Sequence, residues 1–194
     1  MTAPKFIPKK IILLLIILVI AALRLGSFYG VGPLALFTPM GAMGLFGAAY
    51  FKDKISPFLF PLLTLFISDV FVSFALFPQY RVGLLYAGWY WTYGAFVLMI
   101  LAAKFILRDV NIKTVVLSIL SATLIHWLVT DLGLCIQENK FSGSLYLEKL
   151  ITAIPYELRF MAGTTIYSVI MFGSFELLCR KFPSLKLNVS SGSI

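Results

Sequence analysis

Long runs of consecutive apolar residues constrain the fold of this chain more than any other feature. Residues 11–22, for example, carry no polar side chain. A transmembrane β-strand alternates apolar and polar residues, so a membrane barrel does not fit this pattern. A helix of about 20 mainly apolar residues is long enough to cross the hydrocarbon core of a membrane. The runs therefore predict an all-α integral membrane protein.

Composition excludes the other broad classes of protein. The 194 residues are 60% hydrophobic and 12% charged, whereas soluble domains carry about 25% charged residues and disordered chains are still more polar. The net charge of +8 comes from basic residues dispersed between apolar runs, which is typical of membrane topology signals and not of a nucleic-acid interface. With two cysteines and one histidine, neither a structural zinc site nor a disulfide framework is expected.

The hydropathy pattern predicts six transmembrane helices in a single domain, residues 1–182, followed by a loose polar tail, residues 183–194. The second span is short and rich in glycine and alanine, so we expect it to be tilted or packed inside the bundle, where small residues allow close approach. We expect the sixth span to open at Pro155, because proline suits the first turn of a helix. The expected spans cover about residues 9–27, 37–51, 56–77, 82–107, 112–135 and 156–179.

The distribution of Lys and Arg predicts that both termini are cytoplasmic. With that orientation most basic residues fall on the inner side, as the positive-inside rule requires. The inner segments carry Lys5, Lys9, Lys10, Lys52, Lys54, Lys104, Arg108, Lys113, Arg180, Lys181 and Lys186. The outer side carries Arg24, Arg81, Lys140, Lys149 and Arg159.

Ionisable side chains within these spans converge on the outer side. Arg24, Asp69 and His126 each lie about 20 Å from the inner end of a span at 1.5 Å per helical residue. Asp131 follows nearer the outer end of the fifth span. Intramembrane charge is costly and usually pairs or lines a functional cavity. We expect an outward-facing pocket; the alternative is that each group snorkels or forms a structural pair.

Aromatic side chains indicate one wall of this pocket. Tyr86, Trp89, Tyr90 and Tyr93 follow the i, i+3, i+4, i+7 spacing, so they are expected to share one face of the fourth span. The alternative is an interfacial aromatic belt that faces lipid. On the fifth span, Thr123, His126 and Thr130 share a face, with Trp127 and Asp131 beside it. A lone histidine is more often a buried hydrogen-bonding group than a metal ligand.

Six short motifs resemble a family of uncharacterised bacterial membrane proteins related to the substrate-binding S components of energy-coupling factor (ECF) vitamin transporters. In order they span most of the chain: FTPMGA at 37–42, LFGAAYF at 45–51, ISD at 67–69, LVTD at 128–131, AIPY at 153–156 and FGSFEL at 172–177. Departures from the family pattern at His126, Trp127, Asp131 and Arg159 suggest a more charged ligand.

The resemblance implies a six-helix subunit of the bacterial cytoplasmic (inner) membrane that captures a vitamin at its outer face, with cobalamin as one candidate. It also implies a coupling membrane subunit and two cytoplasmic ATPases as partners, and no resident cofactor or metal. We expect Arg24 or Arg159 to meet an anionic group of the ligand. The predicted substrate-binding residues are Arg24, Tyr86, Trp89, Tyr90, Tyr93, His126, Trp127, Thr130, Asp131, Tyr156, Glu157 and Arg159.

Two other functions stay open at this point. A small intramembrane enzyme would need a charged pair, and Asp69 with Arg24 is the pair that the sequence offers. No Walker A, HExxH or Ser/His/Asp signature supports it, so we expect no catalytic residue. The third possibility is an assembly or scaffold protein that binds no ligand.

Overall fold

The computed structural model describes residues 11–19, 38–138 and 142–185, and these residues are mostly helical. Residues 11–19 form the first helix. The remaining helices are α2 (Met40–Tyr50), α3 (Ser56–Phe71), α4 (Trp89–Ile106), α5 (Ile112–Gln137) and α6 (Gly143–Lys181). Shorter elements are the π-helical turn η2 (Val72–Leu76), the 3-10 turns η3 (Pro78–Tyr80) and η4 (Pro183–Leu185), and the paired strands β1 (Arg81–Val82) and β2 (Leu85–Tyr86).

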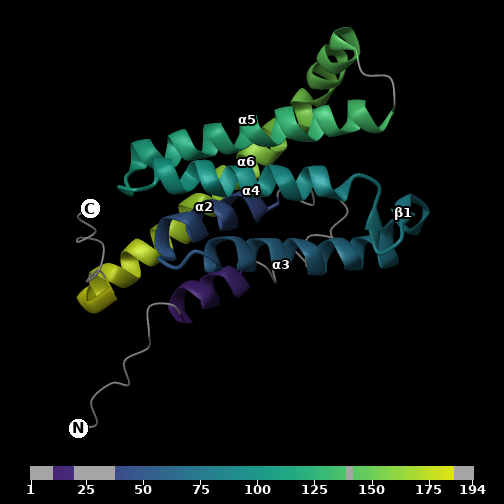
Figure 1. Cartoon of the computed structure of the whole chain (residues 1–194). Coiled ribbons are helices and arrows are strands. Elements are labelled where there is room, and N and C mark those ends of the chain that lie inside the picture. The colour runs from purple at the N-terminus through teal and green to yellow at the C-terminus, as the bar shows by residue number, and fades with distance from the viewer. Residues whose placement is uncertain (1–10, 20–37, 139–141, 186–194) are drawn as a thin grey trace.

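Among the described residues, four helical segments are long and apolar enough to cross a membrane: α3 with η2 (Ser56–Leu76), α4, α5 and α6. They alternate in direction along the chain, so the end of one helix lies beside the start of the next (Figure 1). The chain is therefore an all-α protein with the helices of a membrane-embedded bundle. The predicted first span, 9–27, lies largely outside the described residues.

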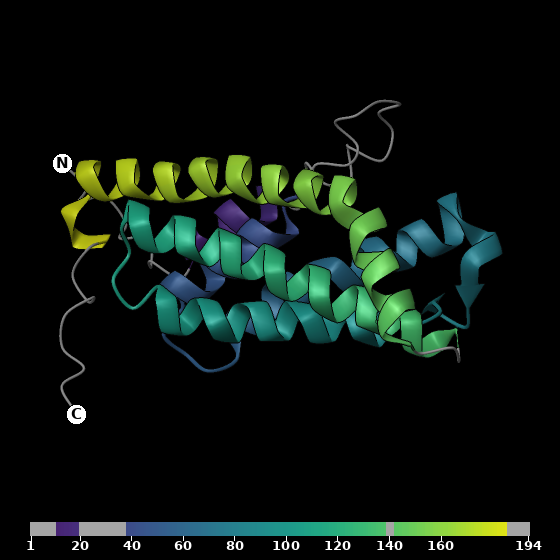
Figure 2. The same cartoon turned by 90° about the horizontal axis from the view of Figure 1, so that it is seen from above.

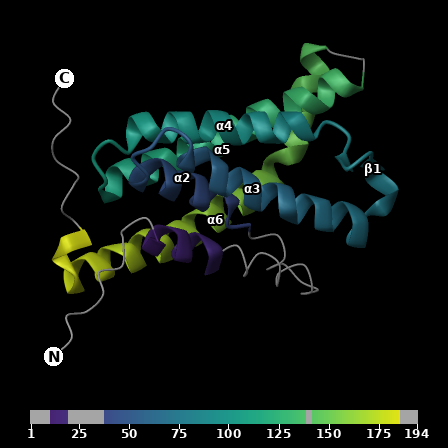
Figure 3. The same cartoon turned by 60° about the horizontal axis from the view of Figure 1, so that its bottom comes forward.

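Helix α2 is the centre of the bundle. It has 11 residues, about 16 Å at 1.5 Å per residue and half of a membrane core, and every residue from Met40 to Ala48 is buried. Its contacts reach α3, α4, α5 and α6, and Figure 3 shows it beneath α4 and α5 and beside α3. The prediction that the short second span packs inside the bundle is confirmed.

Three glycines allow the neighbouring helices to approach α2. A Cβ at Gly41 would overlap the hydroxyl of Thr164 on α6. A Cβ at Gly44 would lie 3.2 Å from Ile100 on α4, and one at Gly47 would lie 3.2 Å from a backbone oxygen of α3. Each glycine therefore serves a different neighbour, which explains why the small residues recur at intervals of three.

The structure corrects two expectations about helix ends, the starts of the fourth and sixth spans. The fourth span begins at Trp89 and not at 82, because the β1–β2 hairpin and the left-handed Gly88 (φ 75°) precede it. Helix α6 begins at Gly143, where the Ser142 side chain accepts a hydrogen bond from Leu145 N–H at 3.2 Å, so Pro155 lies inside the helix and does not open it. The expected loose tail begins with the η4 turn, and Leu185 in that turn is buried.

Helix α6 continues through Pro155 and is bent, so that its first part leans away from the line of the rest (Figure 2). The segment that precedes Pro155 comprises residues 143–154. A proline inside a helix removes one backbone hydrogen bond and its ring crowds the preceding turn. This first segment is here called the α6 arm. It is tied to α5 by Tyr146, whose hydroxyl donates to the Leu128 carbonyl at 3.0 Å, and by an ion pair of Lys149 with Glu138 at 2.6 Å.

Replacing Gly41 by alanine should lower the free energy of unfolding by about 1–3 kcal/mol, because the new Cβ overlaps a fully buried side chain, that of Thr164. Denaturant titration of the purified protein in detergent measures this loss. The control is Gly173→Ala on α6, where the added Cβ meets no atom within 4 Å, and it should be neutral or slightly stabilising. Adding Thr164→Ala to Gly41→Ala should restore part of the loss; equal stability of Gly41→Ala and wild type would refute the close packing.

Candidate functional site

A cavity of about 300 Å³ opens between α3, α4, α5 and α6. It lies toward the end of the bundle where α3 ends, α4 begins and α6 bends. Acidic, basic and aromatic side chains share its wall, which is unusual among otherwise apolar helices. The lining residues are Thr38, Leu65, Asp69, Tyr86, Thr92, Phe96, His126, Tyr156, Glu157, Arg159 and Phe160.

An imidazole–carboxylate pair joins α5 to α6 at this cavity. His126 Nδ1 lies 2.8 Å and 3.1 Å from the two carboxylate oxygens of Glu157. An ionised carboxylate can only accept, so Nδ1 of His126 is the donor to an ionised Glu157. Glu157 is buried, with 8% of its surface exposed. The pair therefore places an imidazole and a carboxylate, hydrogen-bonded to each other, in a region where a lone charge would be costly.

Two phenylalanine rings hold His126 in place. Phe160 stacks on the imidazole at 4.3 Å between ring centroids, with the planes only 13° apart. Phe96 on α4 meets the imidazole edge-on at 5.9 Å. Phe160 follows Glu157 by one helical turn on α6, so one face of α6 supplies both the hydrogen-bond acceptor and the stacking ring. The ring orientation of His126 is thus fixed from both sides.

Asp69 brings a second buried carboxylate to the cavity, from α3. Its Oδ2 accepts a hydrogen bond from the Tyr93 hydroxyl of α4 at 3.3 Å. Tyr93 in turn packs edge-on against Trp89 at 5.2 Å. Tyr93 therefore binds a wall residue of the cavity and is not itself part of the lining.

Arg159 and Tyr156 lie at the open side of the cavity, where both side chains are exposed. The Arg159 guanidinium lies 5.8 Å from the centroid of the Tyr156 ring. Within the described part of the chain, no carboxylate forms an ion pair with Arg159. A positive charge at the entrance, above two buried carboxylates, can meet an anionic group on an entering molecule.

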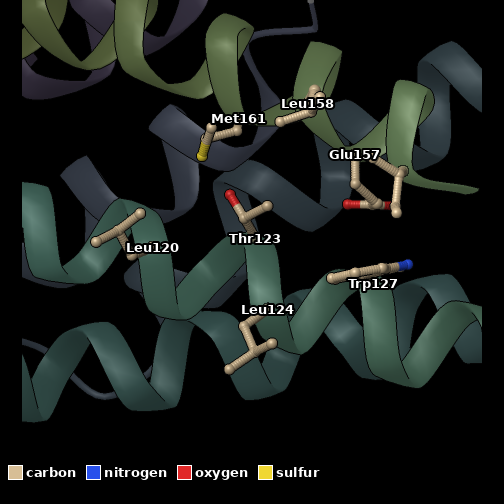
Figure 4. Close-up of a pocket in the computed structure, with 8 residues that line it drawn as sticks. Leu120, Thr123, Leu124, Trp127, Glu157, Leu158 and Met161 are labelled. Atoms are coloured by element: carbon tan, nitrogen blue, oxygen red, sulfur yellow. The ribbon is translucent and has the colours of Figure 1, made fainter. Parts of the chain in front are cut away.

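A second, smaller cavity of about 210 Å³ lies between α5 and α6 (Figure 4). Trp127 and Thr123 reach it from α5, and Glu157 and Met161 reach it from α6. The Trp127 indole N–H donates to the Leu150 carbonyl on the α6 arm at 3.1 Å. Glu157 lines both cavities, so the His126–Glu157 pair stands between them.

The structure brings together five of the predicted binding residues around the larger cavity: Tyr86, His126, Tyr156, Glu157 and Arg159. Tyr86 does so from strand β2, so the expectation that it continues the helical face of Trp89, Tyr90 and Tyr93 is wrong. The β1–β2 hairpin folds back at this end of the bundle, and Tyr86 reaches the wall of the cavity from there.

Other predicted residues lie outside the cavity wall. Tyr90 is 55% exposed, and the Thr130 hydroxyl donates to the carbonyl of His126 on its own helix at 2.7 Å. Asp131 is buried at 5% exposure, and its Oδ2 has no hydrogen-bond partner among the described residues. Arg24 lies outside the described residues.

Six lining residues were not among the predicted binding residues: Thr38, Leu65, Asp69, Thr92, Phe96 and Phe160. Phe160 could have been found, because it follows Tyr156 and Glu157 at helical spacing. Phe96 resembles any other apolar residue of a spanning helix in the sequence. Asp69 was noted for its depth in the membrane but was not assigned to the ligand.

Comparison with known proteins gives a family without a function. Residues 4–185 match a family described as a family of unknown function, DUF6580. No curated protein and no solved structure matches the chain.

Removing the Glu157 carboxylate should lower the free energy of unfolding by about 1–3 kcal/mol, because His126 loses its buried hydrogen-bond partner. The measurement is denaturant titration of Glu157→Ala in detergent. Glu138→Ala is the matched control, since its ion pair with Lys149 is partly exposed and should contribute less than about 1 kcal/mol. Equal losses for the two variants would contradict a structural role for the His126–Glu157 pair.

Proposed function

The chain belongs to the DUF6580 family, and from the residues of its larger cavity we propose that it captures a small water-soluble molecule at one face of a membrane. The observation that carries the proposal is the cavity itself, where Asp69, the His126–Glu157 pair and Arg159 meet among four apolar helices. Polar and ionisable groups are costly at membrane depth and usually mark a binding or transport site. Concave sites with a few convergent polar groups are where small ligands bind.

The more specific form of the proposal is a substrate-binding subunit of a micronutrient uptake transporter of the ECF type. Its support is the motif resemblance of the sequence together with this cavity. The coupling membrane subunit, the two ATPases and the bacterial inner membrane are part of this proposal. A volume of about 300 Å³ is at the lower end of the range for ligand pockets, which favours a small vitamin or precursor. A molecule as large as cobalamin would have to extend beyond the cavity.

Charge at the helix ends supports six spans with both termini in the cytoplasm and the cavity on the outer side. One end of the bundle carries Lys52, Lys54, Lys104, Arg108, Lys113, Arg180 and Lys181. The other end, where the cavity lies, carries Arg81, Lys149 and Arg159 among the described residues. The positive-inside rule assigns the more basic end to the cytoplasm. The cavity then faces the side from which a nutrient arrives.

One observation favours a second candidate, a small intramembrane enzyme. A histidine that is oriented through Nδ1 by a carboxylate is part of the arrangement of a general base. His126 and Glu157 form this pair in the wall of the cavity. The pair that the sequence offered, Asp69 with Arg24, cannot be assessed because Arg24 lies outside the described residues.

Mass spectrometry of small molecules that co-purify with the protein in mild detergent tests the proposal. A captured molecule should be released intact on denaturation, and it should rebind with an affinity that calorimetry can measure. Release of a chemically altered molecule on repeated addition would favour the enzyme. Absence of any bound molecule, together with no binding across a panel of vitamins, would favour a scaffold protein.

Arg159→Ala should weaken binding of the captured molecule by at least about tenfold, because a charge-assisted hydrogen bond contributes about 1.5–3 kcal/mol. Arg159→Lys should recover part of the affinity, since lysine lacks the bidentate fork of arginine. Calorimetry measures both variants. Arg81→Ala is the matched control, because Arg81 is exposed at the same end and lies over the Phe74 ring at 4.1 Å, outside the cavity. Unchanged affinity in Arg159→Ala would remove the anion contact from the proposal.

The proposed orientation predicts opposite labelling of two exposed positions. Ser144 on the α6 arm and Asp109 between α4 and α5 lie at opposite ends of the bundle. A single cysteine at Ser144 should react with a membrane-impermeant maleimide in intact cells, and one at Asp109 should react only after the membrane is opened. Both variants carry Cys135→Ala and Cys179→Ala, which remove the two buried native thiols. The reverse pattern of labelling would show the opposite orientation, with the cavity facing the cytoplasm.

A further inference from the structure

An apolar groove runs along the first half of α3, away from the cavity. Its volume is about 490 Å³, and it is lined by Lys54, Ile55, Phe58, Leu59, Leu62 and Leu63. The apolar members recur at i, i+3, i+4, i+7 and i+8, so they occupy one face of the helix. Ile55, Leu59 and Leu63 are 69%, 48% and 46% exposed. This face is open along its length to whatever surrounds the protein.

One end of the groove is positively charged. Lys54 lines the groove directly before α3. Lys104 comes from α4, and its ammonium group lies 5.7 Å from the centroid of the Phe58 ring. Lys104 is half-buried, and no ion pair joins Lys54 or Lys104 to a carboxylate in the part of the chain that the structure describes. Two lysines without a carboxylate partner among the described residues, at one end of an apolar groove, can accept an anionic group there.

The nearby acidic side chain caps the start of α3. Asp53 accepts a hydrogen bond from the Ser56 backbone N–H at 2.6 Å, within the first turn of α3. Its charge offsets the partial positive charge of the helix start, so the positive charge of this end comes from Lys54 and Lys104. The groove therefore combines a cationic end with an apolar length.

We propose that this groove binds a phospholipid with an anionic headgroup, whose phosphate lies between Lys54 and Lys104 and whose acyl chain lies along α3. The span from Lys54 to Leu63 is about 14 Å at 1.5 Å per residue, close to the depth of one leaflet of a core about 30 Å thick. The lysines are at the more basic end of the bundle, and anionic lipid attracts basic residues at that membrane surface. The site stands apart from the cavity and does not depend on the proposed capture of a ligand.

Native mass spectrometry of the full chain, titrated with dioleoyl phosphatidylglycerol or dioleoyl phosphatidylcholine, tests this site. We expect the wild-type protein to bind the anionic lipid about thirtyfold more tightly than the zwitterionic one, since the two lysines contribute about 1 kcal/mol each near a membrane surface. The double variant Lys54→Gln, Lys104→Gln should lose most of that preference. The control is Lys113→Gln, an exposed lysine at the same end of the bundle on α5, which should keep it.

Two results would overturn the proposal. One is equal affinity of the wild-type protein for the two lipids, and the other is an equal loss of preference in the control and the double variant, which would indicate general surface charge.

The acyl contact is tested with Leu59→Ser, which should weaken binding several-fold, against Leu117→Ser on the exposed face of α5, which should not. Displacement of the lipid by an equal concentration of glycerol 3-phosphate would reassign the site to a soluble anion.

Discussion

The close packing of α2 against the spanning helices is the contact on which the rest of the bundle depends. A helix of 11 residues cannot cross a membrane alone, and α2 is instead covered by protein along its length. Gly41, Gly44 and Gly47 let α6, α4 and α3 approach it. Lipid offers little drive for helices to associate, so surface fit at small residues decides such contacts. Because three helices meet α2 in this way, α2 sets how closely they approach at these contacts.

The polar cavity is stabilised by hydrogen bonds between side chains of neighbouring helices. Glu157 faces His126 across the α5–α6 contact, and Asp69 faces Tyr93 across the α3–α4 contact. Each carboxylate therefore has a donor on the next helix, which reduces the cost of placing it among apolar walls. Arg159, in contrast, stands at the rim without a carboxylate partner in the described structure. Carboxylates that have hydrogen-bond donors in the wall, with an arginine that has no carboxylate partner at the rim, are the arrangement expected of a site that binds a polar ligand.

The apolar runs of the sequence were enough to place most of the helices, because membrane thickness fixes the length of a spanning segment. They also placed α2 inside the bundle, since a run so rich in glycine suits close helix contacts. The level of His126 followed from counting residues along its helix, and its side chain meets that of Glu157, another residue predicted for the site. The binding roles of the predicted residues stay predictions.

Local rules failed where tertiary contacts override them. Pro155 has the signature of a helix start, yet α6 continues through it, because the α6 arm is held against α5 by Trp127 and Tyr146. The polar residues of this arm made it resemble a loop in the sequence. Tyr86 shares the helical spacing of its neighbours, but the hairpin bonds of β1 and β2 stop the helix short of it. The stacking of Phe160 on His126 pairs residues of different helices, which no local pattern reveals.

The bend in α6 also makes the position of the α6 arm depend strongly on the angle of the bend. The α6 arm is 12 residues long by its bounds, 143–154, or about 18 Å. It ends next to Pro155, which lies two residues from Glu157. A change of about 10° in the bend would move the far end of the arm by about 3 Å, by simple geometry on that length. The contacts of Tyr146, Lys149 and Trp127 that hold the arm against α5 would resist such a change, so the position of the tip of the arm depends on whether these three contacts are intact.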